Sequence, residues 1–203
     1  MKHEDCILDK SFGCFLPKDL FKTIKMIEEL NAYWYKKLNF DTPLKEKHWL
    51  IHAGSFMQRL RVHGIRDARI QVLEQSWQLP HFSERKLLNL NFRSFVLVRE
   101  VLILSEKKIW MYARTIIPKS FLKGEYQQLA HLKTRALGAV LFKNKKIKRS
   151  GFEFMCLKTG MTLHEKVRKY FDQEKLWARR SLFSNDATSL LLMEVFTSNT
   201  LNL

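Results

Sequence analysis

The chain is poor in cysteine, and its few thiols are badly placed for a covalent framework. Cys6, Cys14 and Cys156 are an odd number, widely spaced, and no Cys-x-x-Cys pair occurs. This pattern is typical of free thiols in a reducing compartment and argues against a disulfide framework or a cysteine-rich zinc site. Apolar runs long enough to span a bilayer are also absent, as is a secretory apolar core near the N-terminus. We therefore expect a cytoplasmic protein.

The common nucleotide-binding and hydrolase motifs are missing too. The sequence contains no GxGxxG, Walker loop, HExxH or GxSxG. His48 and His52 stand four residues apart, a spacing that places both on one face of a helix, but no third ligand lies nearby. We interpret them as ordinary histidines and predict no metal site.

Acidic residues are scarce relative to basic ones: 20 Asp and Glu against 36 Lys and Arg, a formal net charge of +16. The densest basic run is KNKKIKR, residues 143–149. A solvated loop or helix face is the favoured interpretation; a nucleic-acid patch, contact with an anionic membrane and steering of an anionic substrate stay open. The sequence has no recognition helix, zinc finger or stacking-aromatic motif, so we predict no nucleic-acid partner.

What is present is the pattern of an α+β domain. Its 203 residues suffice for one domain with a sizeable core. Periodicity predicts strands over 68–78, 95–104, 109–118, 151–157, 176–183 and 190–196. It predicts helices over 18–38, 46–63 and 163–175, with 119–142 mostly helical. The strands are expected to form an antiparallel sheet made largely of hairpins.

Three of these strands carry a charge among apolar neighbours. Because side chains alternate along a strand, Arg99 shares a face with Leu97 and Val101, while Glu100 lies opposite. By the same rule Arg114 and Glu194 each stand on an apolar face of their strands. An unpaired charge facing a core is very costly. Either these groups form buried ion pairs, or they face a cavity that holds a ligand.

An ordered set of motifs resembles a known family. The segments VREVLIL, WMYARTIIP, LGAVLF, WARRSLF and LLLMEVF, preceded by GSFMQRL (54–60), are similar to the chorismate–pyruvate lyases that supply 4-hydroxybenzoate for ubiquinone synthesis. The resemblance runs from Gly54 to Phe196 and is loose over 1–50 and 143–176. It implies a single antiparallel β-sheet with helices packed on it and helical flaps over a buried ligand cavity. Residues 1–203 would form one chorismate-lyase-like domain, with 1–50 as an N-terminal helical extension.

The resemblance also implies site residues. Arg99 would bind the ring carboxylate, Glu194 the ring hydroxyl, and Leu137 the ligand through its backbone. Phe56 would line the site where the family usually has methionine or leucine, and Ala136 replaces the proline of a Pro-Leu-Gly turn. We add Arg114 as the candidate for a second carboxylate. Three residues of the WARRS motif are expected to be structural: Trp177, Arg179 and Arg180.

The implied reaction removes pyruvate from chorismate and leaves an aromatic ring. Aromatisation drives it, so no cofactor is expected, and the protein must mainly orient the substrate and handle charge. Arg99 would clamp a carboxylate through its guanidinium fork. Glu194 would accept the C4 hydroxyl or act as a base, two roles that the sequence leaves open.

Two rivals stay open. Effector domains of some transcription regulators share this fold and bind a small ligand without chemistry. A DNA-binding domain of about seventy residues normally precedes them, whereas only about fifty residues precede GSFMQRL here. A basic RNA- or membrane-binding protein is supported by charge alone. The favoured hypothesis is a monomeric lyase acting on chorismate, with weak contact to an anionic membrane surface.

Overall fold

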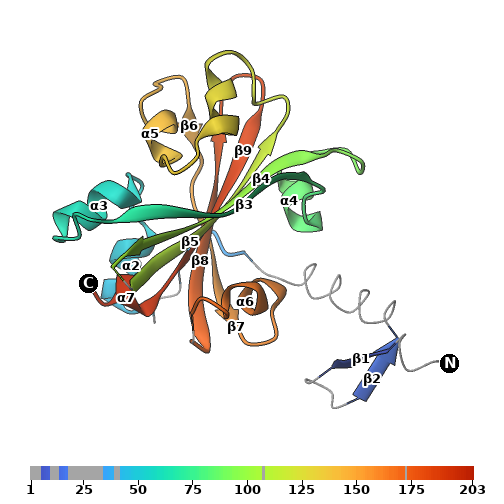
Figure 1. The fold of residues 1–203 in the computed structure, drawn as a ribbon, viewed down its shortest axis with the longest axis vertical. Helices are drawn as coiled ribbons and strands as arrows, with labels where there is room; N and C mark the ends of the chain where they lie inside the picture. The colour runs from blue at the N-terminus through green and yellow to red at the C-terminus, as the bar shows by residue number, and fades with distance from the viewer. Residues whose placement is uncertain (1–5, 10–13, 18–33, 39–41, 107, 172) are drawn as a thin grey trace.

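The computed structural model describes residues 6–9, 14–17, 34–38, 42–106, 108–171 and 173–203. Its main feature is one antiparallel sheet of seven strands in the order β3-β4-β5-β9-β8-β6, with β7 pairing to β8 (Figure 1). A separate two-stranded sheet pairs β1 (Cys6–Asp9) with β2 (Cys14–Pro17). The fold is therefore α+β, as predicted.

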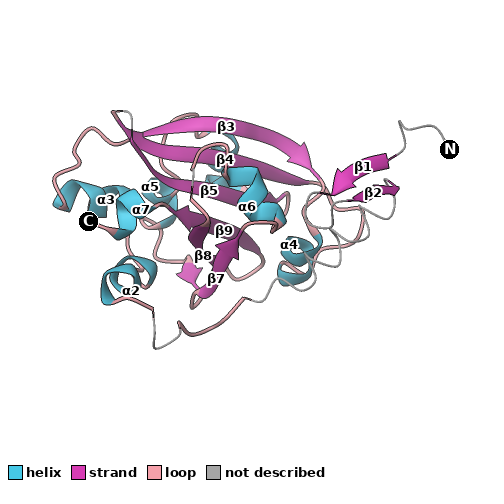
Figure 2. Ribbon diagram, turned by 90° about the horizontal axis from the view of Figure 1, so that it is seen from below, coloured by secondary structure: helices cyan, strands magenta, loops and turns pink. Residues whose placement is uncertain are grey.

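The strands of the main sheet have these bounds: β3 (Arg69–Gln78), β4 (Val96–Ser105), β5 (Lys108–Pro118), β6 (Lys148–Arg149), β7 (Glu153–Lys158), β8 (Lys175–Ser184) and β9 (Ser189–Phe196). The helices are α2 (Leu44–Leu50), α3 (Phe56–Val62), α4 (Phe82–Leu87), the 3-10 helix η2 (Gly124–His131), α5 (Gly138–Leu141), α6 (Thr162–Val167) and α7 (Ser198–Leu201). Figure 2 shows α2, α3 and α7 at one end of the sheet and α4 at the other.

The register divides the central charges between the two faces of the sheet. Arg99 on β4 pairs with Thr115 on β5, and Glu100 pairs with Arg114. Glu194 on β9 is opposite Ala113, so it lies on the face of Arg99 and away from Arg114. We call these the Arg99 face and the Arg114 face.

Both faces are covered, which explains the almost continuous apolar run of β4. On the Arg99 face, α2, α3 and α7 pack around Val101, Ala113 and Phe196, and η2 and α5 extend the cover around Leu97. On the Arg114 face, α6 packs against a cluster that includes Tyr112. Every residue of β4 is consequently buried, as in a strand sandwiched between two layers.

The predicted strands are confirmed to within two residues. The predicted hairpin of 95–104 and 109–118 is β4 and β5, and the last two predicted strands are β8 and β9, which also pair. Strong alternation and apolar character explain this success, because both signals come from burial on each side of the sheet.

The predicted helices are less accurate. The helix over 46–63 is wrong, since it breaks between α2 and α3, where the Ser55 side chain caps α3 by accepting a hydrogen bond from the Gln58 amide at 3.4 Å. The helix over 163–175 shrinks to α6, and 119–142 contains only η2 and α5. Most of 18–38 lies outside the described residues; its last part is not helical, and Tyr35 bridges to Phe154.

Residues 1–50 remain partly outside the described ranges. Their described part contains the β1–β2 pair and α2, whose Trp49 and Leu50 are buried in the core of the Arg99 face. That this region is a helical extension of a single domain stays a prediction.

Candidate active site

Arg99 is a buried cation that no carboxylate neutralises among the described residues. Only 2% of it is exposed. Its Nη2 donates hydrogen bonds to the backbone carbonyls of Lys133 at 2.6 Å and Arg135 at 3.3 Å, and its Nε has no partner. Burial lowers the pKa of Arg99 to about 10, so the guanidinium is still charged at neutral pH. Such a group favours an anionic ligand.

Glu194 faces the same space from β9 and is held by two arginines. Arg179 approaches it as a fork, with Nε 2.6 Å from Oε2 and Nη2 3.0 Å from Oε1, and Nη2 of Arg149 lies 3.0 Å from Oε2. Burial acts to raise the pKa of Glu194, but the two guanidiniums outweigh it and hold the pKa below its ordinary value. Glu194 is therefore an ionised hydrogen-bond acceptor.

The same two arginines donate hydrogen bonds to backbone carbonyls at the end of α2 and in the segment between α2 and α3. Nη1 of Arg179 donates to the carbonyls of Leu50 at 2.9 Å and His52 at 2.7 Å. Nη1 of Arg149 donates to the carbonyl of Ala53 at 2.8 Å. Both guanidiniums also stack on the Phe152 ring, 4.4 Å from its centroid. The position of the segment that begins α3 is thus set by the arginines that hold Glu194.

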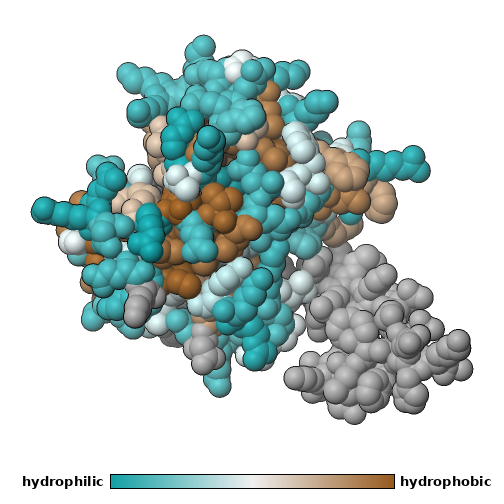
Figure 3. All heavy atoms as spheres, in the orientation of Figure 1, coloured by the Kyte–Doolittle hydropathy of each residue, from teal (hydrophilic) through white to brown (hydrophobic). Residues whose placement is uncertain are grey.

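A pocket of about 70 Å³ lies between these groups. Its polar lining includes Arg99, Arg149 and Glu194, and the remainder is mostly apolar, including Val101 and Ala113 from the sheet. Figure 3 shows a patch of hydrophobic residues on the visible face, beside the place where Figure 1 labels α3. The cation and the carboxylate of this mostly apolar pocket are polar partners for an acidic group and a hydroxyl.

The structure brings four of the predicted site residues together. Arg99 and Glu194 reach the pocket from strands β4 and β9, Phe56 from the first turn of α3, and Leu137 from the position preceding α5. The Ala136-Leu137-Gly138 turn lines it without the proline of the family pattern. Leu137 has helical backbone angles in this turn, φ −54° and ψ −44°.

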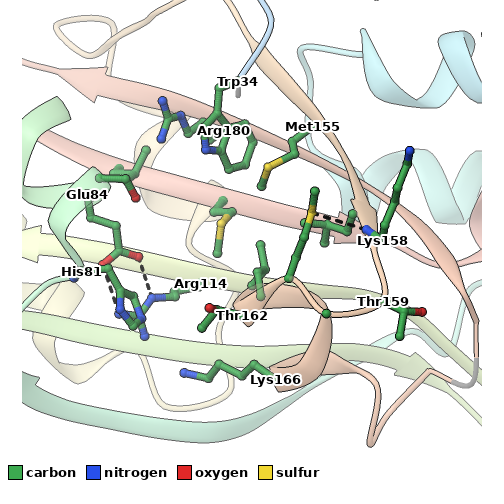
Figure 4. A pocket seen from close by; sticks show the side chains of 17 residues that line it. Trp34, His81, Glu84, Arg114, Met155, Lys158, Thr159, Thr162, Lys166 and Arg180 are labelled. Atoms are coloured by element: carbon green, nitrogen blue, oxygen red, sulfur yellow. Dashed lines mark hydrogen bonds and ion pairs between the residues drawn. The ribbon is translucent and has the colours of Figure 1, made fainter. Parts of the chain in front are cut away.

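Arg114 requires a correction, because it does not share this pocket. It lies on the opposite face, where its Nε is 2.7 Å from Oε1 of Glu84 and its Nη1 is 2.5 Å from Oε1 of Glu100. Arg114 lines a separate pocket of about 510 Å³ together with Glu84 and Lys166. Figure 4 shows Arg114 beside Glu84 in this pocket. Lys166 pairs with Glu100 in turn. One ligand in the Arg99 pocket cannot reach Arg114, and the ion-pair alternative holds for this residue.

Arg149 is the site residue that sequence reasoning missed. It ends the basic run 143–149, which was expected to be solvated as a whole, yet only 12% of its side chain is exposed. The four lysines of the run are exposed, as expected. No local signal separates them, because Lys148 lies on the same short strand β6 and is exposed; the pairing of β6 with β8, which sets Arg149 opposite Phe183, is a long-range contact.

Nothing in the described part of the chain resembles a metal centre, since no group of three His, Cys, Asp or Glu side chains comes together there. The described helices include none that is long and apolar enough to cross a membrane.

The fold is similar to that of an effector domain of known structure. Among solved structures, the chain is similar to the effector domain of PhnF from Mycobacterium smegmatis, with a TM-score of 0.52 and 10% identity over 72% of this chain and 90% of that one. At this identity the likeness concerns the fold alone. One antiparallel sheet with helices packed on it is the chorismate lyase-like fold, as expected from the sequence motifs.

Residues 29–202 match the family model described as chorismate lyase. Curated relatives include the probable chorismate pyruvate-lyase of Coxiella burnetii, 34% identical over 75% of this chain and 82% of the relative. The probable chorismate pyruvate-lyase of Thiobacillus denitrificans is 32% identical over 77% and 84%. The chain belongs to the chorismate lyase family.

Proposed function

We propose that this protein eliminates pyruvate from chorismate to give 4-hydroxybenzoate, the aromatic precursor used in ubiquinone biosynthesis. The observation that carries the proposal is Arg99: a buried guanidinium, unpaired with any carboxylate among the described residues, that faces an apolar pocket. A structural arginine would be neutralised, as Arg114 is. A ligand carboxylate supplies the missing negative charge.

Substrate binding begins at this arginine. Nε of Arg99 is free, while Nη2 is already engaged by two carbonyls that fix the orientation of the fork. The ring carboxylate of chorismate would accept hydrogen bonds from the free side of the guanidinium. Phe56 and Leu137 would close over the ring, and their apolar surfaces exclude water, which strengthens the charge–charge contact.

Glu194 would bind the hydroxyl group on the ring carbon opposite the carboxylate. Because its pKa is lowered, it is an ionised acceptor for the C4 hydroxyl. This favours a positioning role over that of a strong base, since two guanidiniums stabilise its charge. Arg149 lines the pocket beside it and would face the side chain that leaves the ring.

The reaction then needs few protein groups. The bond between C3 and the ether oxygen breaks, the proton on C4 is lost, and the electron pair of that C–H bond completes the aromatic ring. The released enolpyruvate takes up a proton to become pyruvate. Negative charge develops on the leaving oxygen, and the arginines around the pocket would stabilise it without reorganisation. We propose no cofactor for these steps.

Pure protein mixed with chorismate tests the proposal. Pyruvate would be measured by a coupled dehydrogenase and 4-hydroxybenzoate by chromatography, in equal amounts. The matched control is Arg99→Met, which keeps an unbranched side chain and removes the charge. If the protein binds 4-hydroxybenzoate but releases no pyruvate from chorismate, the enzyme assignment is wrong and a non-catalytic ligand-binding domain takes its place.

A further inference from the structure

A cluster of large apolar side chains is exposed at the end of the molecule that carries α4. Phe92 is 78% exposed, Phe95 59% and Trp77 48%, and Leu79 and Phe82 are exposed as well. Scattered exposed apolar residues need no explanation, but five within 19 residues of sequence do. We call these five residues the aromatic tip.

The register and the ring contacts place residues of the aromatic tip in two groups. Gln78 is opposite Val96 where β3 meets β4, so the residues just beyond, Leu79 and Phe95, leave the sheet side by side. On α4, the guanidinium of Arg85 lies over the ring of Phe92 at 4.4 Å and over that of Phe82 at 5.6 Å.

The tip projects and is not a groove. Figure 1 shows the connection between α4 and β4 at the edge of the molecule, beyond the rest of the sheet, and Figure 3 shows hydrophobic residues there. A projecting apolar surface inserts into a soft medium, whereas a peptide or a ligand is bound in a concave one.

Most charges beside the tip are positive; the exposed exception is Glu74, whose Oε1 accepts hydrogen bonds from Ser76 and Gln78. Lys86 and Arg93 are exposed and Arg85 is half-buried. The only acidic residue between positions 75 and 95 is Glu84, which is buried and neutralised by Arg114. Aromatic rings flanked by arginine and lysine are the composition of a segment that lies in the interface of an anionic bilayer.

We propose that the aromatic tip docks this protein on the surface of an anionic membrane. Phe92 and Phe95 enter the headgroup region, and Lys86, Arg85 and Arg93 contact the lipid phosphates. The contact is peripheral and reversible, because the inserted area is small and the charges act only near the surface. It does not depend on the catalytic assignment, since the tip is separate from the Arg99 pocket.

Cosedimentation with vesicles tests the tip. Wild-type protein is mixed at about 0.1 M salt with vesicles of phosphatidylcholine containing about 30 mol% phosphatidylglycerol, and with phosphatidylcholine alone. We expect binding to the anionic vesicles only. The double variant Phe92→Ser/Phe95→Ser should lower the bound fraction about fivefold or more. The double variant Lys86→Gln/Arg93→Gln should also lower the bound fraction, and its difference from the wild type should shrink as the salt concentration rises.

A matched control is available at the other end of the molecule. Leu44 and Val62 are 83% and 80% exposed, on α2 and α3. Leu44→Ser/Val62→Ser should bind vesicles as the wild type does, and all variants should keep the wild-type melting temperature. The proposal is overturned if the wild type does not bind, if the phenylalanine variant binds normally, or if removing the lysines of 143–149 alone abolishes binding.

Discussion

Three arginines on the central strands are almost fully buried, and their partners distinguish what each of them does. Arg114 is neutralised by Glu84 and Glu100, and Arg179 by Glu194. Arg99 has only carbonyl partners in the part of the chain that the structure describes. Two of the three therefore stabilise the sheet through ion pairs, and the third carries a charge that the fold itself leaves uncompensated.

Arg99→Met should abolish useful activity without destabilising the protein. The guanidinium contributes a charge-assisted clamp of about 3 kcal/mol or more to the transition state, so kcat/KM should fall by a factor of about 100 or more. Its removal relieves a buried, unpaired cation, so the melting temperature should stay unchanged or rise. Steady-state kinetics and calorimetry measure both; near-normal kcat/KM would contradict the proposed role.

Arg114→Met should destabilise the protein, in contrast to Arg99→Met. The substitution leaves two buried carboxylates, Glu84 and Glu100, without their shared cation, which costs about 3–5 kcal/mol of the free energy of unfolding. Denaturant unfolding measures the loss. The triple variant that also carries Glu84→Gln and Glu100→Gln should recover much of the stability, because no buried charge is then left unpaired by the change. A stable single variant would show that these ion pairs contribute little.

Glu194→Gln should separate binding from turnover. The amide can still hydrogen-bond the ring hydroxyl, so the affinity for 4-hydroxybenzoate should fall less than kcat. Isothermal titration and initial rates make the comparison. Equal losses, together with a large drop in melting temperature, would instead indicate that Glu194 serves only its ion pairs with Arg179 and Arg149.

The pH dependence of stability gives an independent check on Glu194. Its pKa is depressed in the folded state. The stability that it contributes is therefore complete above about pH 4.3, the pKa of an unfolded glutamate, and is lost as the pH falls through the lower folded value. The wild-type advantage over Glu194→Gln should accordingly be constant between about pH 5 and pH 8.

At the scale of elements, the important feature is the segment that joins α2 to α3. Its carbonyls at Leu50, His52 and Ala53 accept hydrogen bonds from the two arginines that hold Glu194. One ion-pair cluster therefore fixes the position of the Glu194 carboxylate in the pocket and the position of α3, which carries Phe56. A change at Arg149 should therefore affect both the segment between α2 and α3 and the pocket.

Arg149→Gln should loosen this segment. It removes the charged donor to the Ala53 carbonyl and one of the two cations on Glu194. Hydrogen exchange of amides 51–55 should become faster, while that of β4 and β5 should not change. Lys148→Gln, an exposed neighbour in the same run, is the matched control. Equal exchange in both variants would show that Arg179 alone holds the segment.

At the scale of the whole molecule, the net charge of +16 is the dominant property. The exposed lysines of the run 143–149 can attract a dianionic substrate, and exposed charges act over about 8 Å at physiological salt. The attraction raises the rate of encounter and leaves the chemical step unchanged.

Neutralising the exposed lysines of this run should flatten the salt dependence of kcat/KM and leave kcat nearly unchanged. The four changes are Lys143→Gln, Lys145→Gln, Lys146→Gln and Lys148→Gln. Stopped-flow or initial-rate assays over a range of salt concentrations measure the effect, provided that association limits kcat/KM. Loss of tight, sequence-selective binding to a nucleic acid in this variant would contradict the proposed use of the charge.

The sequence by itself determined the six longer strands of the main sheet and the α+β class. Alternation along 95–104 and 190–196 was enough to place Arg99 and Glu194 on apolar faces, because strand geometry is local. The motif order then indicated the family, and with it Phe56 and Leu137.

Only the tertiary structure decided which charges meet. A strand pattern states which side a residue takes within its own strand, but the pairing register decides which sides of different strands coincide. Register put Glu194 with Arg99, and Arg114 on the far face with Glu84, a residue from a distant helix. The pairing of β6 with β8 likewise places Arg149, the last residue of the basic run, in the lining of the pocket. Long-range contacts of this kind depend on how the whole chain packs, and no local pattern encodes them.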